Sequence, residues 1–248
     1  MPETVGSFLA VYGRIPVLEA LADEQLEVEQ VLVSRRARGE HVDDIVRAAT
    51  ARGVPVRVVS PEKVTRMSGN GRQDQGVVAD VRSAGVRPLE AAAFPATGPV
   101  AVLVLDGVTN PANVGMIVRT AVAAGCDGVV LPRAGGPDVG PLVVKASAGV
   151  ALRAPIFSNE TALGAVSLLK NAGFRVVGLV AGSGVPLWSW EPPERVALVL
   201  GSESEGLSPA VVEALDGTVA IPLAGGVESL NVAVAAGVVC FALRRGRA

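Results

Sequence analysis

Five short runs of almost unbroken apolar residues constrain the fold of this chain more than any other feature. They are VAVLVLD (100–106), GVVLP (128–132), FRVVGLV (174–180), RVALVLG (195–201) and TVAIPL (218–223). Runs of this length, rich in Val and Leu, are typical of parallel strands that helices cover on both faces. The C-terminal part of the chain is therefore predicted to form an open α/β sheet, whose ligands bind at the carboxyl ends of the strands.

Helices are expected in the segments between these strands. The predicted helices span residues 111–124, about 139–149, 161–172, 208–215 and 230–244. Two of them have clear start signals, because Asn110 precedes Pro111 and Ser208 precedes Pro209, the pattern of an N-cap followed by proline at the first helical position.

The N-terminal part also alternates between helix and strand patterns. Helices are predicted in PVLEALA (16–22), HVDDIVRAATARG (41–53) and SPEKVTRM (60–67), and strands in VEQVLVS (28–34), VPVRVVS (54–60) and QGVVADV (75–81). The stretch SAGVRPLEAAAFPATGP (83–99) has no clear period and is interpreted as a linker. We therefore expect a small α/β domain over residues 1–82, a linker over 83–97 and the larger α/β domain over 98–248.

Composition and missing motifs exclude several classes of protein. No apolar stretch approaches the roughly 20 residues of a membrane span, and the start MPETVGSFLAVYGR lacks a signal-peptide pattern, so we expect a cytoplasmic protein. Cys126 and Cys240 lie in apolar surroundings, which favours buried thiols over a disulfide or a metal site. The single histidine, His41, falls in a predicted surface helix, and neither a dinucleotide fingerprint nor a P-loop is present. We expect no metal and no membrane partner.

Charge alone does not select a polyanion as partner. The formal net charge is −2, so nucleic acid would need a local basic patch. Basic residues do gather in two predicted loop regions, the first with Arg35, Arg36 and Arg38 and the second with Lys63, Arg66 and Arg72. These side chains are either solvated surface charges or contacts for phosphates.

Three polar loops follow strands of the predicted sheet: DGVTNPAN (106–113), GSESEGLS (201–208) and PLAGGVESLN (222–231). Each alone is explained as a turn that begins a helix. Together they indicate a ligand site, because their glycines permit close backbone approach; these are Gly201, Gly206, Gly225 and Gly226. Arg119 lies on the flank of the apolar stripe of its helix, where it either reaches such a ligand or stays in solvent.

The same loops resemble the three signature motifs of the SpoU (TrmH) family, the SPOUT-class RNA 2′-O-ribose methyltransferases. The matching segments are NPANVGMIVRTA (110–121), VLGSESEGLS (199–208) and IPLAGGVESLNVAVAAGV (221–238), and VVKASAGVAL (143–152) resembles a further family element. VYGRIPVLEAL (11–21) with QGVVADV (75–81) is similar to the family's L30e-like substrate-binding domain. Family members often have His before the QG pair, where this chain has Asp74.

The resemblance implies a C-terminal domain tied in a deep trefoil knot that holds S-adenosylmethionine, a topology that general folding rules would not suggest. It assigns cofactor contacts to five residues: Gly201, Ile221, Leu223, Leu230 and Ala181. Family members are homodimers, so we expect a homodimer through the C-terminal domain with its sites near the interface.

The resemblance also implies roles in catalysis. Asn113 and Asn231 would fix the ribose or Arg119, Glu203 would orient Arg119, and Ser229 would bind a phosphate or the ribose. The family proposal makes the residue at the Arg119 position the base that takes the 2′-hydroxyl proton. A guanidinium holds its proton too firmly to act readily as a base, so a second role stays open, in which Arg119 grips the adjacent phosphate and orients the 2′-oxygen.

The substrate that the resemblance favours is 23S rRNA. A dedicated L30e-like domain is similar to the ribosomal-RNA branch, which includes guanosine-modifying and antibiotic-resistance enzymes, more than to the compact tRNA branch. The basic residues around Arg35 and Arg66 would then contact phosphates. The alternatives are a tRNA methyltransferase of the same chemistry and a non-catalytic RNA-binding protein on the same fold.

Overall fold

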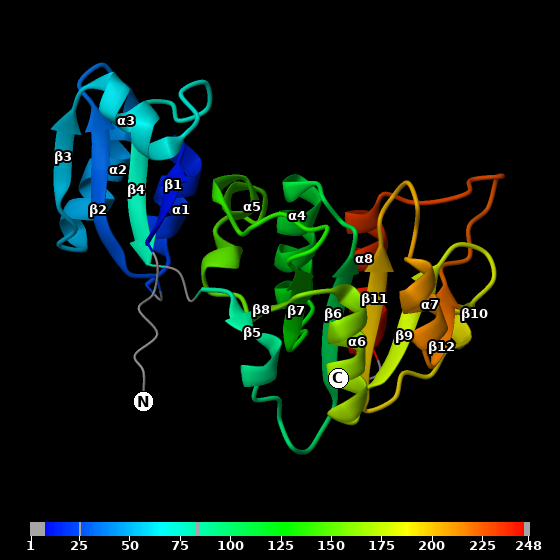
Figure 1. Ribbon diagram of the computed structural model, residues 1–248. Coiled ribbons are helices and arrows are strands. Elements are labelled where there is room, and N and C mark those ends of the chain that lie inside the picture. The colour runs from blue at the N-terminus through cyan, green and yellow to red at the C-terminus, as the bar shows by residue number, and fades with distance from the viewer. Residues whose placement is uncertain (1–7, 25, 83–84, 246–248) are drawn as a thin grey trace. The chain divides into compact units, whose positions relative to one another are not determined.

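The computed structural model describes residues 8–24, 26–82 and 85–245 (Figure 1). By its internal contacts the chain divides into two compact units. Unit 1 contains residues 1–85 and 139–153, and unit 2 contains residues 86–138 and 154–248. The expected domain ends at residues 1–7 and 246–248, and the beginning of the expected linker at 83–84, lie outside the described residues.

Unit 1 is built on a four-stranded sheet in the order β1-β4-β2-β3. Its strands are β1 (Phe8–Tyr12), β2 (Val28–Ser34), β3 (Val56–Val59) and β4 (Val77–Arg82). β4 is antiparallel to both of its neighbours, and β2 and β3 are parallel. The sequence patterns predicted β2, β3 and β4, whereas β1 was missed.

Helices cover both faces of this sheet. α1 (Arg14–Ala22) and α2 (Glu40–Ala51) share one apolar cluster with alternate strand residues such as Val31 and Val33. α3 (Pro61–Ser68) packs on the opposite face, where Val64 meets Leu32 and Val78. The residues alternate between the faces because successive side chains of a strand point to opposite sides of a sheet.

A second segment of the chain also belongs to unit 1. α5 (Pro141–Ala146) and the short 3-10 helix η2 (Val150–Leu152) contribute Val144 and Leu152 to the cluster that α1 and α2 cover. The helix expected over about 139–149 is therefore a six-residue helix that completes the core of the N-terminal unit.

Unit 2 contains an eight-stranded sheet in the order β10-β12-β9-β11-β6-β7-β8-β5, and every strand pair in it is parallel. The five expected strands are present as β6 (Val100–Asp106), β7 (Gly128–Pro132), β9 (Arg175–Val180), β11 (Arg195–Gly201) and β12 (Gly217–Ala220). The α/β prediction is thus confirmed.

Three further strands were not predicted for this sheet. They are β8 (Ile156–Asn159) and the two-residue edge strands β5 (Arg87–Pro88) and β10 (Val185–Pro186). β5 and the following 3-10 helix η1 (Leu89–Ala91) lie in the stretch that was interpreted as a linker. Leu89 is buried there in the core of unit 2, so this part of the stretch is structured.

Helices cover both faces of the larger sheet (Figure 1). α6 (Ala162–Asn171) and α7 (Pro209–Ala214) cover the face to which Val102 and Val104 point. α4 (Pro111–Ala123) and α8 (Val232–Arg245) contact each other on the opposite face. None of the helices in the described ranges is long and apolar enough to cross a membrane. The expected trefoil knot stays a prediction.

Both cysteines lie in unit 2. Cys240 is buried and Cys126 is half-buried, and neither forms a disulfide within the described part of the chain. A hydrogen bond with Cys126, together with burial, raises the pKa of the Cys240 thiol. In the same described residues, no group of three or more His, Cys, Asp or Glu side chains could hold a metal ion.

Candidate active site at the carboxyl ends of the strands

The loop that follows β11 folds tightly on itself. Ser202 N donates to Gly206 O at 2.9 Å, and Gly206 N donates back to Ser202 O at 3.1 Å. The hydroxyl of Ser202 also accepts a hydrogen bond from Glu205 N at 3.1 Å. A Cβ on Gly201 would lie 2.2 Å from the carbonyl carbon of Gly206, so only glycine fits there. This loop therefore holds Glu203 and Glu205 on a fixed backbone.

A carboxylate at the end of β6 links the first polar loop to the second. Asp106 Oδ2 accepts a hydrogen bond from Ser208 N at 2.7 Å. Ser208 stands at the N-cap position of α7 as predicted, but its hydroxyl makes no capping hydrogen bond. Asn110 does cap α4, because its Oδ1 accepts from Ala112 N at 2.9 Å. This contact of Asp106 was not predicted from the sequence.

Glu203 joins all three polar loops through one oxygen atom. Its Oε1 accepts hydrogen bonds from Asn113 Nδ2 at 3.0 Å, from Val232 N at 3.2 Å and from Asn231 Nδ2. Asn113 is only 4% exposed, and its own Oδ1 accepts from Asn231 Nδ2 at 3.2 Å. Residues more than 90 positions apart in the sequence are therefore fixed against one carboxylate.

Asn231 both caps a helix and takes part in the polar network. Its Oδ1 caps α8 by accepting from Ala233 N at 3.0 Å and from Val234 N at 3.2 Å. Its Nδ2 points the other way, to Asn113 and Glu203. The two interpretations of Asn231, as the start of the last helix and as a site residue, are thus compatible.

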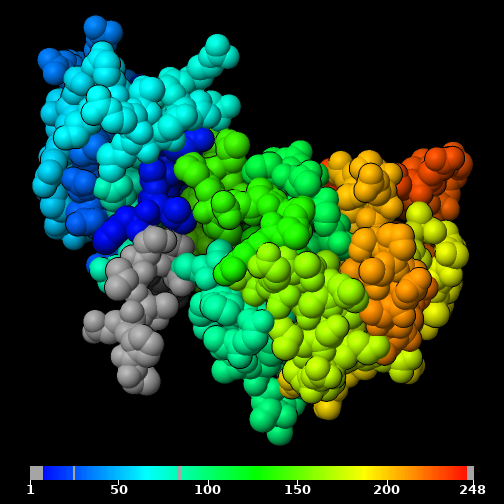
Figure 2. Space-filling model, in the orientation of Figure 1, coloured from blue at the N-terminus to red at the C-terminus, as the bar shows by residue number. Residues whose placement is uncertain are grey.

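An apolar cavity of about 290 Å³ lies beside this network. All five residues expected to contact the cofactor line it, together with Glu203 and Ser229; the five are Gly201, Ile221, Leu223, Leu230 and Ala181. Further residues that line this cavity were not predicted as cofactor contacts, such as Leu179, Leu200 and Ala235. The loop between β12 and α8, orange-red in Figure 2, contributes to this lining and projects from the surface of unit 2.

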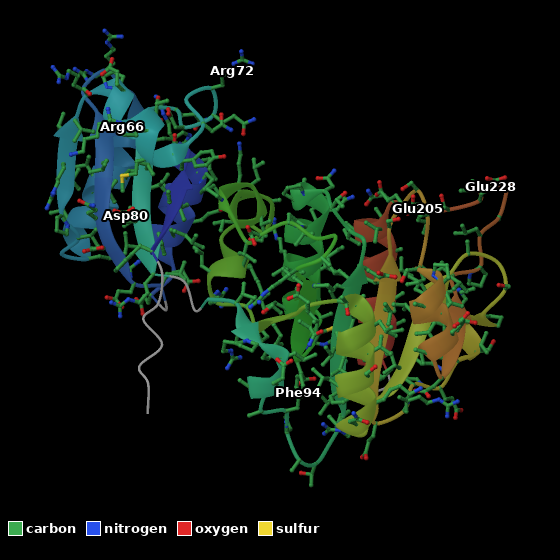
Figure 3. The ribbon with its side chains drawn as sticks, in the orientation of Figure 1. Arg66, Arg72, Asp80, Phe94, Glu205 and Glu228 are labelled. Atoms are coloured by element: carbon green, nitrogen blue, oxygen red, sulfur yellow. The ribbon has the colours of Figure 1, made fainter. Side chains whose placement is uncertain are left out.

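A second, polar cavity of about 560 Å³ adjoins the first. The two cavities share Glu203 and four neighbouring residues, Ser202, Gly206, Leu207 and Val232. Asp106, Thr109, Asn110, Asn113 and Glu205 also line the polar cavity. No Lys or Arg is among the described residues that line either cavity. Glu205 and Glu228 both stand at this end of unit 2 (Figure 3).

Arg119 is not brought to the other candidate catalytic residues within this chain. It is exposed on α4 and lines neither cavity. Within the described ranges its side chain makes no hydrogen bond or ion pair. Arg119 follows Asn113 by six residues, which turns its side chain about 120° away around the helix axis. Asn113, Glu203, Ser229 and Asn231, in contrast, meet around the two cavities.

The six basic residues predicted to bind RNA are all exposed on unit 1: Arg35, Arg36, Arg38, Lys63, Arg66 and Arg72. Figure 3 shows Arg72 on the loop between α3 and β4. Arg38 also orders its own loop, because its Nη1 donates to the carbonyl oxygens of Arg35 and Ala37, both at 2.7 Å.

The charge of this surface acts on the one acidic residue at the start of α3. Hydrogen bonds from its own backbone and from Ser60 lower the pKa of Glu62. The nearby guanidinium groups of Arg36 and Arg35 lower the pKa further. The two arginines thus lie close enough to the beginning of α3 to form one basic surface with it.

Asp74 organises the loop that carries Arg72. Its side chain is 5% exposed and accepts hydrogen bonds from Gly76 N at 2.8 Å and from the hydroxyls of Thr65 and Ser68, both at 3.2 Å. The next residue, Gln75, has a positive φ of 52°, and its Oε1 accepts from Arg14 N at 2.9 Å, at the start of α1. The buried carboxylate therefore acts inside unit 1, as an anchor for the turn.

Comparison with protein families gives two matches along the chain. The SpoU rRNA Methylase family matches residues 100–241. A second family, described as RNA 2'-O ribose methyltransferase substrate binding, matches residues 10–85. The first match also spans residues 139–153, the second segment of unit 1, so together the two matches cover most of both units.

Individual relatives agree with these matches. The chain is 34% identical over 240 residues to the 23S rRNA (guanosine-2'-O-)-methyltransferase RlmB of Xanthomonas axonopodis pv. citri, which covers 96% of each protein. It resembles the crystal structure of an AdoMet-bound rRNA methyltransferase from Sinorhizobium meliloti, with a TM-score of 0.72, 25% identity, and coverage of 96% of this chain and 87% of that one.

A tRNA-modifying enzyme resembles this chain over a shorter part of its length. The TrmH/SpoU enzyme of A. aeolicus has a TM-score of 0.54 and 28% identity, and the match covers 61% of this chain and 76% of that one. The share of this chain outside that match is large enough to contain an additional domain.

Proposed function

The chain belongs to the SpoU rRNA methylase family, and on that premise we propose that it methylates a ribose 2′-hydroxyl of 23S rRNA with S-adenosylmethionine as the methyl donor. The observation that carries the proposal is the set of hydrogen bonds around Glu203, which assembles all three signature loops beside one apolar cavity. We expect the enzyme to work in the cytoplasm, where ribosomal RNA is processed.

The apolar cavity fits the cofactor. Its walls are apolar side chains and loop backbone, and the space beside Gly201 depends on the absence of a Cβ. Such a cavity suits the flat adenine ring and leaves the backbone groups to fix its orientation. We assign cofactor contacts to Gly201, Ile221, Leu223, Leu230 and Ala181. When bound, S-adenosylmethionine supplies an electrophilic methyl group on a positively charged sulfur.

The residues of the polar network would position the ribose. Asn113 and Asn231 keep their amide groups in fixed directions because Glu203 accepts from both. Glu203 is thus a positioning residue for the two amides. Ser229 lines the cofactor cavity and offers a hydroxyl to the substrate ribose or its phosphate. Alignment of this kind removes a large part of the activation free energy of methyl transfer, because the reacting oxygen is held in line with the methyl group.

Arg119 would contact the phosphate next to the target ribose. A guanidinium stays protonated at any physiological pH, so it can bind a phosphate with two parallel hydrogen bonds, whereas acting as a base would first require the loss of its proton. In this role Arg119 orients the 2′-oxygen and stabilises negative charge that develops beside it.

We propose that two copies of the chain associate through α4 and α8. The surface of these helices exposes large apolar side chains, with Met116 41%, Val234 54% and Phe241 53% exposed. Arg119 lies one helical turn after Met116, on the same exposed side of α4. A second copy on this surface would bury the apolar groups and would take Arg119 out of bulk solvent, next to an assembled site.

Sedimentation measurements test the dimer. We expect the wild type to sediment as a dimer and the double variant Val234→Glu, Phe241→Glu to sediment as a folded monomer with little methyl transfer. A wild type that stays monomeric at micromolar concentration would contradict the proposed association.

The relatives favour ribosomal RNA over tRNA. The relative that shares 96% of its length with this chain is named as a 23S rRNA enzyme, whereas the match to the tRNA-modifying enzyme covers 61% of this chain. The N-terminal family match, described as substrate binding, accounts for residues 10–85. Its exposed basic side chains suit a large polyanionic substrate.

Methyl incorporation from radiolabelled S-adenosylmethionine tests the function and the substrate together. Purified 23S rRNA and purified tRNA are offered separately, and the modified nucleotide is mapped by resistance of its 3′ linkage to alkaline hydrolysis. We expect incorporation at one ribose of 23S rRNA. Incorporation into tRNA alone would identify tRNA as the substrate in place of 23S rRNA. Cofactor binding without transfer to either RNA would favour a non-catalytic RNA-binding protein.

A further inference from the structure

We propose that Cys126 and Cys240 form a reversible disulfide when the protein is exposed to hydrogen peroxide, and that this bond slows methyl transfer. The two residues are the only cysteines of the chain. Formation of the bond does not depend on the proposed function, whereas its effect on methyl transfer rests on that function.

Cys126 is held in place by the turn that ends α4. Gly125, with a positive φ of 73°, redirects the chain after the helix. Cys126 N donates to Ala121 O at 2.9 Å, and Gly125 N donates to Val122 O at 3.0 Å, which is the pair of hydrogen bonds of a Schellman motif. The backbone of Cys126 therefore has one defined position at the end of α4.

One face of α8 packs on this end of α4. Gly237, Cys240 and Arg244 lie on that face, because they are three and four residues apart. A Cβ on Gly237 would lie 3.6 Å from Thr120 Cγ2, and Arg244 Nη1 donates to Ala123 O at 3.2 Å. Contacts before and after Cys240 thus hold its turn of the helix against the end of α4.

The two thiols contact each other and differ in exposure. A hydrogen bond joins them, and together with burial it raises the pKa of the Cys240 thiol. Cys240 is 0% exposed, whereas Cys126 is half-buried. Both line a surface pocket of about 270 Å³, which shares no lining residue with the two cavities of the candidate site. A small oxidant therefore has access to Cys126 and, through Cys126, to the pair.

Hydrogen peroxide can oxidise the pair in two steps. The Cys126 sulfur attacks one peroxide oxygen, the O–O bond breaks, and the thiol proton leaves with the other oxygen as water, so that Cys126 becomes a sulfenic acid. The Cys240 sulfur then attacks the Cys126 sulfur, the S–O bond breaks, and the departing hydroxide takes the Cys240 proton to form a second water. The two thiols lose two electrons and two protons, and the peroxide is reduced to two molecules of water.

A disulfide at this point would displace site residues on α8. The sulfur atoms of a disulfide are about 2.05 Å apart, closer than two sulfurs that share a hydrogen bond, so Cys240 must move toward Cys126. Val232 lies eight residues before Cys240 on the same helix, roughly 12 Å along its axis, and would move with it. Because Val232 N and Asn231 Nδ2 both donate to Glu203, this movement would disturb the alignment of the polar network.

Peroxide treatment followed by mass spectrometry tests the bond. We expect the wild type to lose two hydrogen atoms, to yield a peptide that links Cys126 to Cys240, and to regain both thiols in dithiothreitol. A non-reducing gel shows whether the link lies within one chain, because a bond between two copies would appear at twice the mass. A wild type that keeps both thiols, or that links only between copies, overturns the proposal.

Methyl transfer by the oxidised wild type tests the effect on activity. We expect kcat to fall roughly 10- to 100-fold, because a misplacement of about 1 Å can cost as much, and to recover in dithiothreitol. Cys126→Ser and Cys240→Ala cannot form the bond, so each should keep its own untreated rate in peroxide. The double variant is the matched control, because it retains the three methionines, which peroxide also oxidises.

The outcomes separate this inference from the proposed function. A reduced wild type that methylates no RNA contradicts the proposed function and with it the effect on rate, while the peptide map still decides whether the bond forms. A bond that forms without loss of rate, or a loss of rate that persists in both single variants, overturns the switch. Since Cys126 is half-buried, Cys126→Ser keeps the test valid if Cys240→Ala does not fold.

Discussion

The predicted RNA-binding surface of unit 1 and the two cavities of unit 2 carry different kinds of charge. In unit 1 the six basic residues predicted to bind RNA are exposed, and one of them, Arg38, also holds a loop in place. Unit 2 lines its two cavities with carboxylates, amides and apolar groups, and the described lining holds no Lys or Arg. On the proposed function, we expect affinity for the phosphate backbone to come from unit 1 and positioning of the reacting ribose to come from unit 2.

The two units also differ in how firmly their functional groups are held. Long-range attraction between basic side chains and phosphates tolerates mobile side chains, because it varies slowly with distance. Methyl transfer requires alignment of a few atoms, and the amide side chains of Asn113 and Asn231 in unit 2 are tied by hydrogen bonds to Glu203. Variants in the two units should therefore change different measured quantities.

The largest effect is expected from Arg119→Ala. We expect kcat to fall by about 100-fold or more, as when a charge-stabilising donor is removed from an active site, while the affinity for S-adenosylmethionine stays nearly unchanged. Arg119 lines neither cavity, which is why cofactor binding should persist. Single-turnover methyl transfer and calorimetry measure the two quantities, and near-normal turnover of this variant would refute the assignment.

The second-largest effect is expected from Gly201→Ala, which should weaken the binding of the cofactor. The new methyl group would lie 2.2 Å from the Gly206 carbonyl carbon, so the loop must move. Overpacking of this kind costs about 1–3 kcal/mol, which corresponds to a loss of roughly 5- to 150-fold in cofactor affinity. Gly217→Ala is the control, because a Cβ there meets nothing within 4 Å. Equal cofactor affinity of the two variants would show that the close approach does not shape the cavity.

Removing charge from unit 1 should weaken RNA binding and leave chemistry intact. For the double variant Arg35→Gln, Arg36→Gln we expect roughly tenfold weaker binding, and a salt dependence whose log–log slope is smaller by about 1.5 to 2. At saturating RNA, kcat should be that of the wild type. Arg47→Gln on α2, where the arginine pairs with Asp44, serves as the control. An unchanged slope would place the RNA contact elsewhere on the molecule.

The smallest effect is expected from Asp74→Asn. The amide can replace only part of a carboxylate that accepts from Gly76 N, Thr65 and Ser68, so we expect a loss of about 1 kcal/mol in the free energy of unfolding. RNA affinity should fall only a few-fold, because the loop with Arg72 loosens. Urea denaturation and RNA titration measure both quantities. If neither changes, Asp74 does not anchor this turn.

Much of unit 2 could be predicted from the sequence because its signals are local. Long apolar runs mark buried strands, and the family resemblance named the five residues that line one cavity, four of them in the signature loops and Ala181 outside them. β5 and β10 have two residues each, too few to produce a period. The packing of Val144 and Leu152 into unit 1 was also not predictable, since contacts between distant segments leave no local pattern.

The residues of the site could be predicted more fully than the contacts between them. The motifs identified Asn113, Glu203 and Asn231, but not that Glu203 would accept from both amides. They also did not separate Arg119 from its proposed partners, because a position on a helix flank does not specify what faces it. Asp106 was missed since a single carboxylate after a strand has no distinctive spacing.

The hydrogen bond from Val232 N to Glu203 bears on the point during synthesis at which the chain can first transfer a methyl group. Chains are synthesised from the N-terminus, and α8 follows every other element of unit 2. A nascent or truncated polypeptide that stops before residue 232 lacks one of the donors that complete the site, even with all the strands present. Methyl transfer should therefore begin abruptly, when the last helix docks, and an incomplete chain on the ribosome would be unable to modify RNA.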